Sequence, residues 1–318
     1  MNRTITDITK FICCILIFIH HFYLRNPIVY SLGYIACTIF FFLSAFGVYS
    51  SLERKPQNFY LFVKSKVKRI IFPVLLVNII FLTITSPILG INYKIPIFRV
   101  FCDNISFLPV NPYNLVGSIL GFIKIDSVTW FIDVLIIAYL FIWGLFRIHS
   151  KVSKNLIILL GYITILLGGG IFNLEPYYII DTFGIALGLL YAINKNRIDS
   201  FLCKYRIEKY VTLVILSFLV TFEYFYKDII QFRFLLLIEL GYVLLSVIMV
   251  IYAGMYTKYQ KLHIPALLGS ISFFIYLVHV KIACIIYCSY GKYFFLTLSV
   301  VFVIAVLLMK LNDSLIKK

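Results

Sequence analysis

Ten long apolar segments recur along this chain, and they limit its fold more than any other feature. They are residues 8–24, 30–51, 70–86, 129–147, 155–172, 177–193, 210–226, 232–256, 266–288 and 292–310. Most are near the ~20 residues that a helix needs to cross a bilayer. Hydrophobic residues make up 62% of the 318 residues, charged residues 13%, and mean hydropathy is +1.01. The sequence therefore predicts an all-α membrane protein, with about ten transmembrane helices in a single bundle.

The distribution of basic residues predicts the orientation of these helices. Of the 29 Lys and Arg residues, 21 fall on the side of the termini and 8 on the other side. Because basic residues are enriched in cytoplasmic loops, both termini are predicted to be cytoplasmic. The same bias accounts for the net charge of +16, so nucleic acid is not an expected partner. The expected location is a cell membrane, most simply a bacterial plasma membrane, with multiple spans.

The remaining organisation predicts one membrane domain over residues 1–318. The first apolar segment has no small-residue cleavage site behind it and is interpreted as retained. One long connection, residues 87–129, is predicted outside; it contains an apolar piece, residues 115–125, that is too short to span. The seven cysteines are scattered, with no CxxC and no Cys/His metal spacing. Neither a disulfide framework nor a metal site is expected.

Lys10 and His21 stand out in the first apolar segment. Ionisable groups in hydrocarbon cost several kcal/mol unless they face a cavity or a partner, so each is a candidate functional residue. Eleven residues separate them, which is about three helical turns, so they share nearly one face at roughly 16 Å along the axis. The alternative is a structural histidine bonded to a neighbouring serine or carbonyl. His20 is expected about 100° away, toward lipid or another helix.

A second candidate is the basic run KSKVKRIIFP, residues 64–73, between the second and third apolar segments. It contains Lys64, Lys66 and Arg69. Lysine and arginine provide charge-assisted donors to phosphate, which suits a nucleotide-bearing cofactor. The competing interpretation is an ordinary topological cluster at anionic lipid headgroups.

Two further candidates lie in the fourth and ninth apolar segments. Asp133 follows Trp130 by one turn, and a carboxylate at that depth requires a partner. His279 follows Ser272 and Tyr276 on roughly one helix face; a structural histidine is the alternative. Lys281 is predicted to extend outward as a topological anchor. By the predicted topology His21, Asp133 and His279 lie in the outer half of the membrane, whereas Lys10 and the basic run lie on the inner side.

Taken in order, these motifs resemble acyltransferase family 3, the polytopic O-acyltransferases of surface polysaccharides. The family's Arg-x10-His is similar to Lys10-x10-His21, and its FFFLSGF-like segment to residues 39–49. Its R-x-x-R before a proline resembles Lys66–Pro73, its WFL segment Trp130–Ile132, and its late YLxH segment residues 271–279. The resemblance covers residues 5 to about 310. Two residues depart from it: Lys10 replaces an arginine and so lacks the bidentate fork, and Ala45 replaces a glycine.

The resemblance implies acyl transfer from cytoplasmic acyl-CoA, most simply acetyl-CoA, to a glycan or lipid-linked glycan. Lys10, Lys64, Lys66 and Arg69 would bind the phosphates of the donor. His21 would act as general base toward a sugar hydroxyl. Trp130, Tyr276 or His279 would orient the reactants, with Asp133 at similar depth. An acyl-enzyme on Cys13, Cys14 or Ser44 has no adjacent base identifiable from the sequence.

Two other functions remain open at this point. A transporter or flippase for lipid-linked sugars would use the same polar residues as a path, and a polysaccharide polymerase is a third option. No matched pair of spans is broken by proline near mid-depth, which disfavours a transporter. Binding of coenzyme A distinguishes the acyltransferase from a flippase. Membrane lipids are expected partners in every case.

Overall fold

A computed structural model describes residues 3–23, 27–89, 130–172, 174–204, 232–256, 263–290 and 293–316, with a few isolated positions between 205 and 231. Every element within these ranges is helical, and no strand occurs among them. The residues form two compact units. Unit 1 comprises Met1–Pro56 and Leu135–Gly269; unit 2 comprises Gln57–Val134 and Ser270–Lys318. The all-α prediction is therefore confirmed for the described part of the chain.

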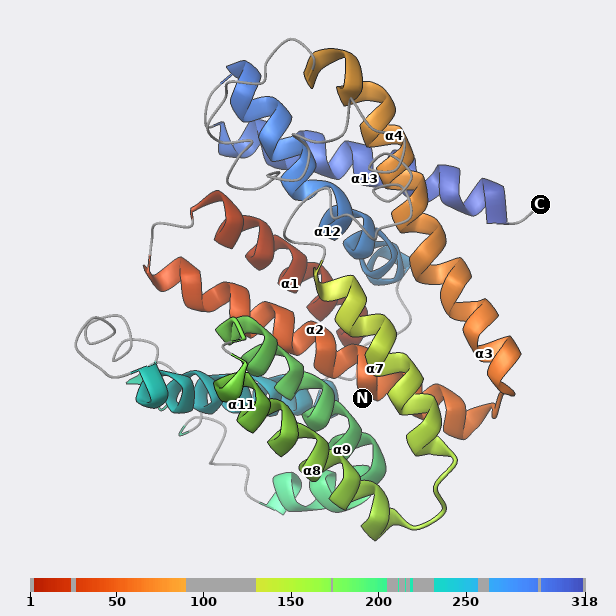
Figure 1. The fold of residues 1–318 in the computed structure, drawn as a ribbon, viewed down its shortest axis with the longest axis vertical. Coiled ribbons are helices and arrows are strands. Elements are labelled where there is room, and N and C mark those ends of the chain that lie inside the picture. The colour runs from red at the N-terminus through yellow and green to blue at the C-terminus, as the bar shows by residue number, and fades with distance from the viewer. Residues whose placement is uncertain are drawn as a thin grey trace. The chain divides into compact units, whose positions relative to one another are not determined.

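Unit 1 is built mainly from five helices and the second part of a sixth (Figure 1). They are α1 (Arg3–Phe22), α2 (Pro27–Arg54), α8 (Lys151–Ile171), α9 (Pro176–Lys204), α11 (Phe232–Tyr256) and the later turns of α7 (Trp130–Phe146). Helix α8 begins after Ser150, whose hydroxyl accepts the N–H of Ser153 at 3.2 Å and so caps the first turn. Helix α9 bends at Asn194, where the backbone leaves helical geometry (φ −111°, ψ 18°).

Helices α2 and α9 form the closest contact within unit 1. Gly184 and Gly188 lie four residues apart on α9, and so share one face. A methyl group on Gly184 would collide with the carbonyl oxygen of Thr38, and one on Gly188 with that of Phe42. Small residues at this spacing let two membrane helices approach until their backbones touch. The close approach then allows the Thr38 hydroxyl to donate to the Asp181 carboxylate at 3.1 Å.

Unit 2 contains a continuous rod followed by two later helices. Its elements are α3 (Phe59–Lys66), the π-helical turn η1 (Val67–Ile71), α4 (Phe72–Leu89), the start of α7, most of α12 (His263–Tyr290) and α13 (Phe294–Ile316). Pro73 has no N–H to bond the carbonyl of Arg69, and its ring would crowd that carbonyl in a regular α-helix. The wider π turn immediately before it accommodates the proline without ending the rod.

Six helices of the described part are long and apolar enough to cross a membrane. They are residues 3–22, 32–54, 151–169, 238–255, 266–283 and 294–316. Helix α7, with 17 residues, is shorter. The predicted span 177–193 lies in α9, the predicted span 70–86 lies largely in α4, and the predicted span 210–226 lies mostly outside the described residues, as does the connection 87–129. The count of ten, the single bundle and the cytoplasmic termini stay predictions.

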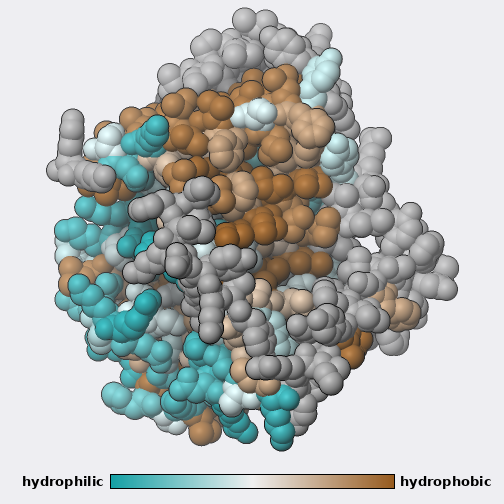
Figure 2. All heavy atoms as spheres, turned by 180° about the vertical axis from the view of Figure 1, so that it is seen from behind, coloured by the Kyte–Doolittle hydropathy of each residue, from teal (hydrophilic) through white to brown (hydrophobic). Residues whose placement is uncertain are grey.

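Large apolar side chains remain exposed where a bilayer would cover them. On α8 the exposed residues include Leu156, Leu160 and Leu167, and on α13 they include Phe295 and Leu307. Figure 2 shows apolar side chains gathered over a broad area of the face that it draws. Contiguous apolar surface of this kind is uncommon on soluble monomers and suits contact with lipid.

The glycine contact between α2 and α9 is testable with a matched pair of substitutions. Gly184→Ala should lower the free energy of unfolding by about 1–3 kcal/mol, because the added methyl meets backbone that cannot move aside. Gly47→Ala on α2 adds a methyl with nothing within 4 Å and should be neutral or stabilising. Thermal unfolding of the purified variants in one detergent compares the two; equal melting temperatures would contradict the packing described here.

Candidate active site

Helix α1 carries Lys10 and His21 on one uninterrupted element. The helix runs from Arg3 to Phe22 without a break, so the predicted separation of about 16 Å along its axis is maintained. Both side chains are half-buried. One unbroken helix of unit 1 therefore carries both the cation and the acid/base group, and their different depths in a membrane stay a prediction.

Asp7 is a charged neighbour of Lys10 that the sequence reasoning missed. It lies one turn before Lys10 on α1, and the two charges interact. Its carboxylate also lies 3.7 Å from the guanidinium of Arg3. A methyl on Gly269 would collide with Asp7, so α12 begins against this carboxylate. The sequence already indicates the interaction of Asp7 with Lys10, because residues three positions apart are neighbours on a helix surface.

His20 and His21 have different surroundings although they are adjacent. The ring of His20 packs directly on Gly33 of α2, where a methyl would lie 2.5 Å from its Cγ. The His20 ring also contacts that of His21 edge-on, with centroids 4.8 Å apart. His20 thus faces a neighbouring helix, one of the two alternatives predicted for it. The His20 ring thus fills the contact between α1 and α2, next to the ring of His21.

Unit 2 brings together the aromatic and histidine candidates of α7 and α12. The ring of Phe131 lies 5.1 Å from that of Tyr276, and Tyr276 lies 5.7 Å from His279. Trp130 follows at 6.4 Å from Phe131 and is half-buried. The start of α7 therefore packs on α12 through Phe131 and Tyr276, with Trp130 next to the first of these rings and His279 next to the second.

The bonding of His279 selects its tautomer. His279 is buried, and its Nδ1 lies 2.7 Å from the carbonyl oxygen of Tyr276, one turn earlier. A carbonyl oxygen only accepts, so Nδ1 carries the proton. A neutral His279 then has its lone pair on Nε2. The hydrogen bond to its own helix fixes the orientation of the ring, which agrees with the structural role that the sequence left open for His279. The Nε2 atom of the neutral ring is a hydrogen-bond acceptor.

Lys281 does not extend outward, and that prediction is wrong. The residue is 1% exposed. Its Nζ donates to the carbonyl oxygen of Leu277 at 3.1 Å and lies 6.0 Å from the ring centroid of Phe81 on α4. A backbone carbonyl and an aromatic face together replace part of the solvation that an outward lysine would have kept. A buried cation two residues after His279 is thus a polar feature of unit 2 that the sequence reasoning assigned to the surface.

Asp133 occupies an exposed position on α7, one turn after Trp130. The prediction that this carboxylate requires a partner stays a prediction. Cys13 and Cys14 are buried on α1, and Ser44 is half-buried on α2. Among the residues that the structure describes, no group of three His, Cys, Asp or Glu side chains could hold a metal ion.

The basic run forms the junction of α3 and the π turn. Asn58 caps α3 by accepting the N–H of Leu61 at 2.9 Å. Lys64 is exposed and lies 5.7 Å from the ring of Tyr60, while Lys66 lies 5.0 Å from the ring of Phe62. Arg69 is exposed within η1. Of the four predicted phosphate-binding cations, the three in this run thus comprise two exposed residues, Lys64 and Arg69, and the half-buried Lys66.

Burial lowers the pKa of the Lys66 amine below that of an ordinary lysine. Partial desolvation, and then the positive charge of Arg69, lower the pKa of Lys66 to about 8. Lys66 is therefore charged below about pH 8 and loses its charge as the pH rises through that value. An anion bound near Lys66 and Arg69 would oppose both causes and favour the charged form.

A buried carboxylate on α9 was not identified from the sequence. Asp181 is 1% exposed and accepts a hydrogen bond from Thr38. Its charge interacts with that of Glu239 on α11, which is also buried. An aspartate in an apolar segment was a usable signal, because charged residues in such segments usually face a polar partner.

A sequence model of an acyltransferase domain, that of acyltransferase family 3, matches residues 5–310. The chain belongs to acyltransferase family 3. The match spans nearly the whole chain, so the protein is a membrane acyltransferase. No curated protein and no solved structure matches it.

The two departures from the family's motifs have different surroundings. Lys10 lies beside Asp7, so the charge at this position is partly matched within α1. Ala45 lies buried on α2 opposite Gly188 of α9; a methyl on Gly188 would lie 3.0 Å from the Ala45 Cβ. Alanine is therefore accommodated because the facing residue is a glycine.

The titration of Lys66 can be measured directly. Labelling with an amine-reactive ester at increasing pH, read by peptide mass spectrometry, should give a midpoint near pH 8 for Lys66, since only the neutral amine reacts. The same peptide in denaturant should give a midpoint near that of an ordinary lysine, about 10.4. Arg69→Gln should move the folded midpoint upward, because it removes a nearby positive charge. A folded midpoint equal to the denatured one would refute the assignment.

Proposed function

We propose that the protein is a membrane O-acyltransferase that moves an acyl group, most simply acetyl, from cytoplasmic acyl-CoA to a hydroxyl of a cell-surface polysaccharide or its lipid-linked precursor. The observation that carries the proposal is α1, where Lys10 and His21 lie on one unbroken helix. A separation of about 16 Å suits a donor with an anionic head and a reactive thioester at the end of an extended pantetheine arm.

The cations of the inner side would bind the donor's phosphates. Lys64 and Arg69 are exposed and available, and Lys66 is charged below about pH 8. Arginine offers a planar fork to phosphate oxygens, whereas lysine offers a point charge. Lys10 on α1 would contact the anionic part of the donor more weakly than an arginine, because it lacks the fork. Its charge also interacts with that of Asp7.

His21 would act as the general base. Its neutral imidazole takes the proton from the sugar hydroxyl as the oxygen attacks the thioester carbonyl. The carbon–sulfur bond then breaks, and the proton passes from the imidazolium to the departing thiolate, which gives coenzyme A and the ester. The proton balance closes without a metal or a further cofactor.

The aromatic and histidine group of unit 2 would orient a reactant. His279 is fixed through Nδ1 and presents Nε2, and Tyr276 and Trp130 bring polar groups on rigid rings. Rigid side chains of this kind can hold a sugar or a thioester with little loss of conformational entropy. Asp133 is exposed one turn after Trp130 on α7, and would contribute at the rim.

Substitution of the two adjacent histidines separates catalysis from packing. His21→Ala should lower the rate of acyl transfer by about 10²–10⁴-fold, the usual contribution of a general base. His20→Ala should retain most of the rate but lower the melting temperature, because it removes a ring packed on Gly33. The measurements are acyl transfer to the host's surface glycan and thermal unfolding. Equal activity of the two variants would remove His21 from the mechanism.

Donor titration tests the division between binding and chemistry. Lys10→Ala and Arg69→Ala should raise KM for acyl-CoA by about tenfold, since contacts to the donor's anionic part act as uniform binding. Lys10→Arg should bind the donor at least as well as the original protein. His21→Ala should lower kcat with KM nearly unchanged. Lys310→Ala, at an exposed lysine of α13, is the control.

The same titration distinguishes the flippase alternative. A flippase needs no coenzyme A, so purified protein would show no affinity for it. Unchanged donor affinity in both Lys10→Ala and Arg69→Ala would mean that coenzyme A does not bind at these cations.

A further inference from the structure

A buried lysine outside the proposed catalytic residues joins three helices of unit 1. Lys154 of α8 donates from Nζ to the hydroxyl of Tyr49 on α2 at 2.8 Å. The same Nζ lies 5.3 Å from the ring centroid of Tyr49 and 5.8 Å from that of Phe146, at the end of α7. One ammonium group is thus held by a hydroxyl and two aromatic faces.

Lys154 has no counter-charge among the residues that the structure describes. The residue is 9% exposed, and no carboxylate of the described part forms an ion pair with it. Glu53 lies one turn beyond Tyr49 on α2 but is exposed. Burying a cation is costly unless a partner replaces water, and a hydroxyl with two aromatic faces replaces only part of it. The ammonium group of Lys154 is shielded from solvent, but no negative charge lies beside it among the described residues.

The position of Lys154 on α8 adds to this positive potential. The helix begins at Lys151, so Lys154 lies in its first turn. A helix N-terminus carries a partial positive charge and disfavours a cation there. A buried lysine in that turn is therefore stabilised further when an anion is present. By contrast, Lys10 already has Asp7 beside it.

We propose that Lys154 and Tyr49 form a phosphate-binding site at the end of unit 1 where α2 and α7 finish and α8 begins. The lysine provides a point charge for a phosphate oxygen. The Tyr49 hydroxyl accepts from Lys154 and retains its own hydrogen to donate to a second oxygen. By the charge-based orientation this end faces the cytoplasm, so the phosphate belongs either to the acyl donor or to an inner-leaflet lipid headgroup. The donor source rests on the proposed function, whereas the lipid source does not.

The first arm of the experiment measures coenzyme A. The whole protein is placed in phosphatidylcholine nanodiscs, and binding of coenzyme A and of dephospho-coenzyme A is measured by calorimetry. If the donor is the source, Lys154→Met should weaken coenzyme A binding by about tenfold or more. Tyr49→Phe keeps the ring and should cause a smaller loss. Lys151 is an exposed lysine of the same turn, so Lys151→Met should change the affinity for coenzyme A by less than about twofold.

The second arm measures lipid. If a headgroup phosphate is the source, coenzyme A binding will be equal in all variants. The melting temperature of the original protein will then rise as phosphatidylglycerol replaces phosphatidylcholine, and this rise will be absent in Lys154→Met but present in Lys151→Met. An original protein with no affinity for coenzyme A would contradict the proposed function, and the lipid arm alone would then decide the site.

Two results overturn the site. One is a Lys154→Met variant that matches the original protein in both arms; the other is a Lys151→Met variant that loses as much as Lys154→Met. If Lys154→Met does not fold, Lys154→Arg and Tyr49→Phe replace it. Lys154→Arg keeps the charge and should retain coenzyme A affinity in the first arm, or the rise in melting temperature in the second. Tyr49→Phe should reduce the same quantity. A Tyr49→Phe variant equal to the original protein in both arms would then refute the proposal.

Discussion

The contact of α2 with α9 is the constraint on which unit 1 depends. Gly184 and Gly188 bring the two helices to backbone contact, a distance that no larger side chain permits at these positions. In a bilayer the lipid tails are as apolar as the side chains, so helix association relies on such close packing and on polar contacts more than on hydrophobic burial. Ala45 and Thr38 face the same seam, so the second-span motif of the family serves helix packing as well as any chemistry.

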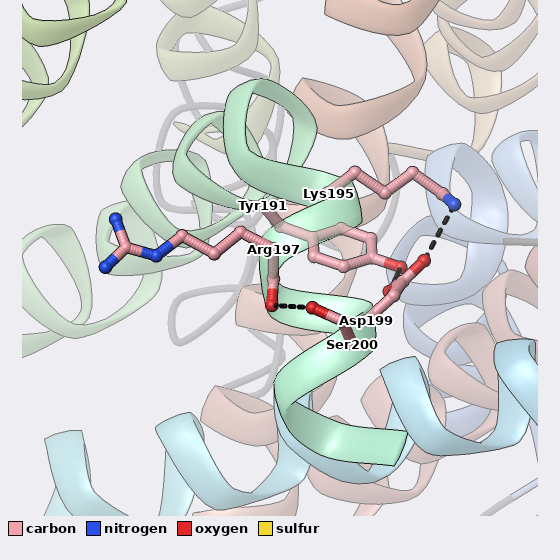
Figure 3. A network of polar contacts seen from close by, with 5 residues as sticks. All are labelled: Tyr191, Lys195, Arg197, Asp199 and Ser200. Carbon is pink, nitrogen blue, oxygen red and sulfur yellow. Dashed lines mark hydrogen bonds and ion pairs between the residues drawn. The ribbon is translucent and has the colours of Figure 1, made fainter. Parts of the chain in front are cut away.

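The close contact also determines which polar groups unit 1 can bury. Asp181 reaches the Thr38 hydroxyl only because the two backbones are close, and Glu239 adds a second carboxylate from α11. At the opposite end of α9, Tyr191 donates to Asp199 at 2.8 Å, and Lys195 forms an ion pair with the same carboxylate at 2.7 Å (Figure 3). There the carboxylate has a cation and a hydroxyl, so it needs no further partner. Lys154 differs from both carboxylates, because no counter-charge lies beside it among the residues that the structure describes.

The sequence predicted the parts of the fold and the site that depend on period and composition. Lys10 and His21 lie on one unbroken helix, where a spacing of eleven residues is close to three turns, and Tyr276 and His279 meet because they are one turn apart. What it could not predict depends on tertiary packing. The sequence predicted that Lys281 extends outward, but the residue is buried, where its ammonium group contacts the Leu277 carbonyl and the Phe81 ring. Asp7 beside Lys10 was within reach of the same periodic argument, whereas the pairing of Asp181 with Thr38, 143 residues apart, was not.

The π turn at Val67–Ile71 has a consequence for how this chain can vary. A π turn contains one residue more than the α-helical turn that it replaces, and here it stands between the cations of α3 and the apolar body of α4. Loss of one residue from it would restore regular winding and rotate everything before it by about 100° around the rod. Lys64 and Lys66 would then point in new directions while every side chain of α4 kept its place. The length of this turn, more than the identity of its residues, sets the direction in which the basic run faces.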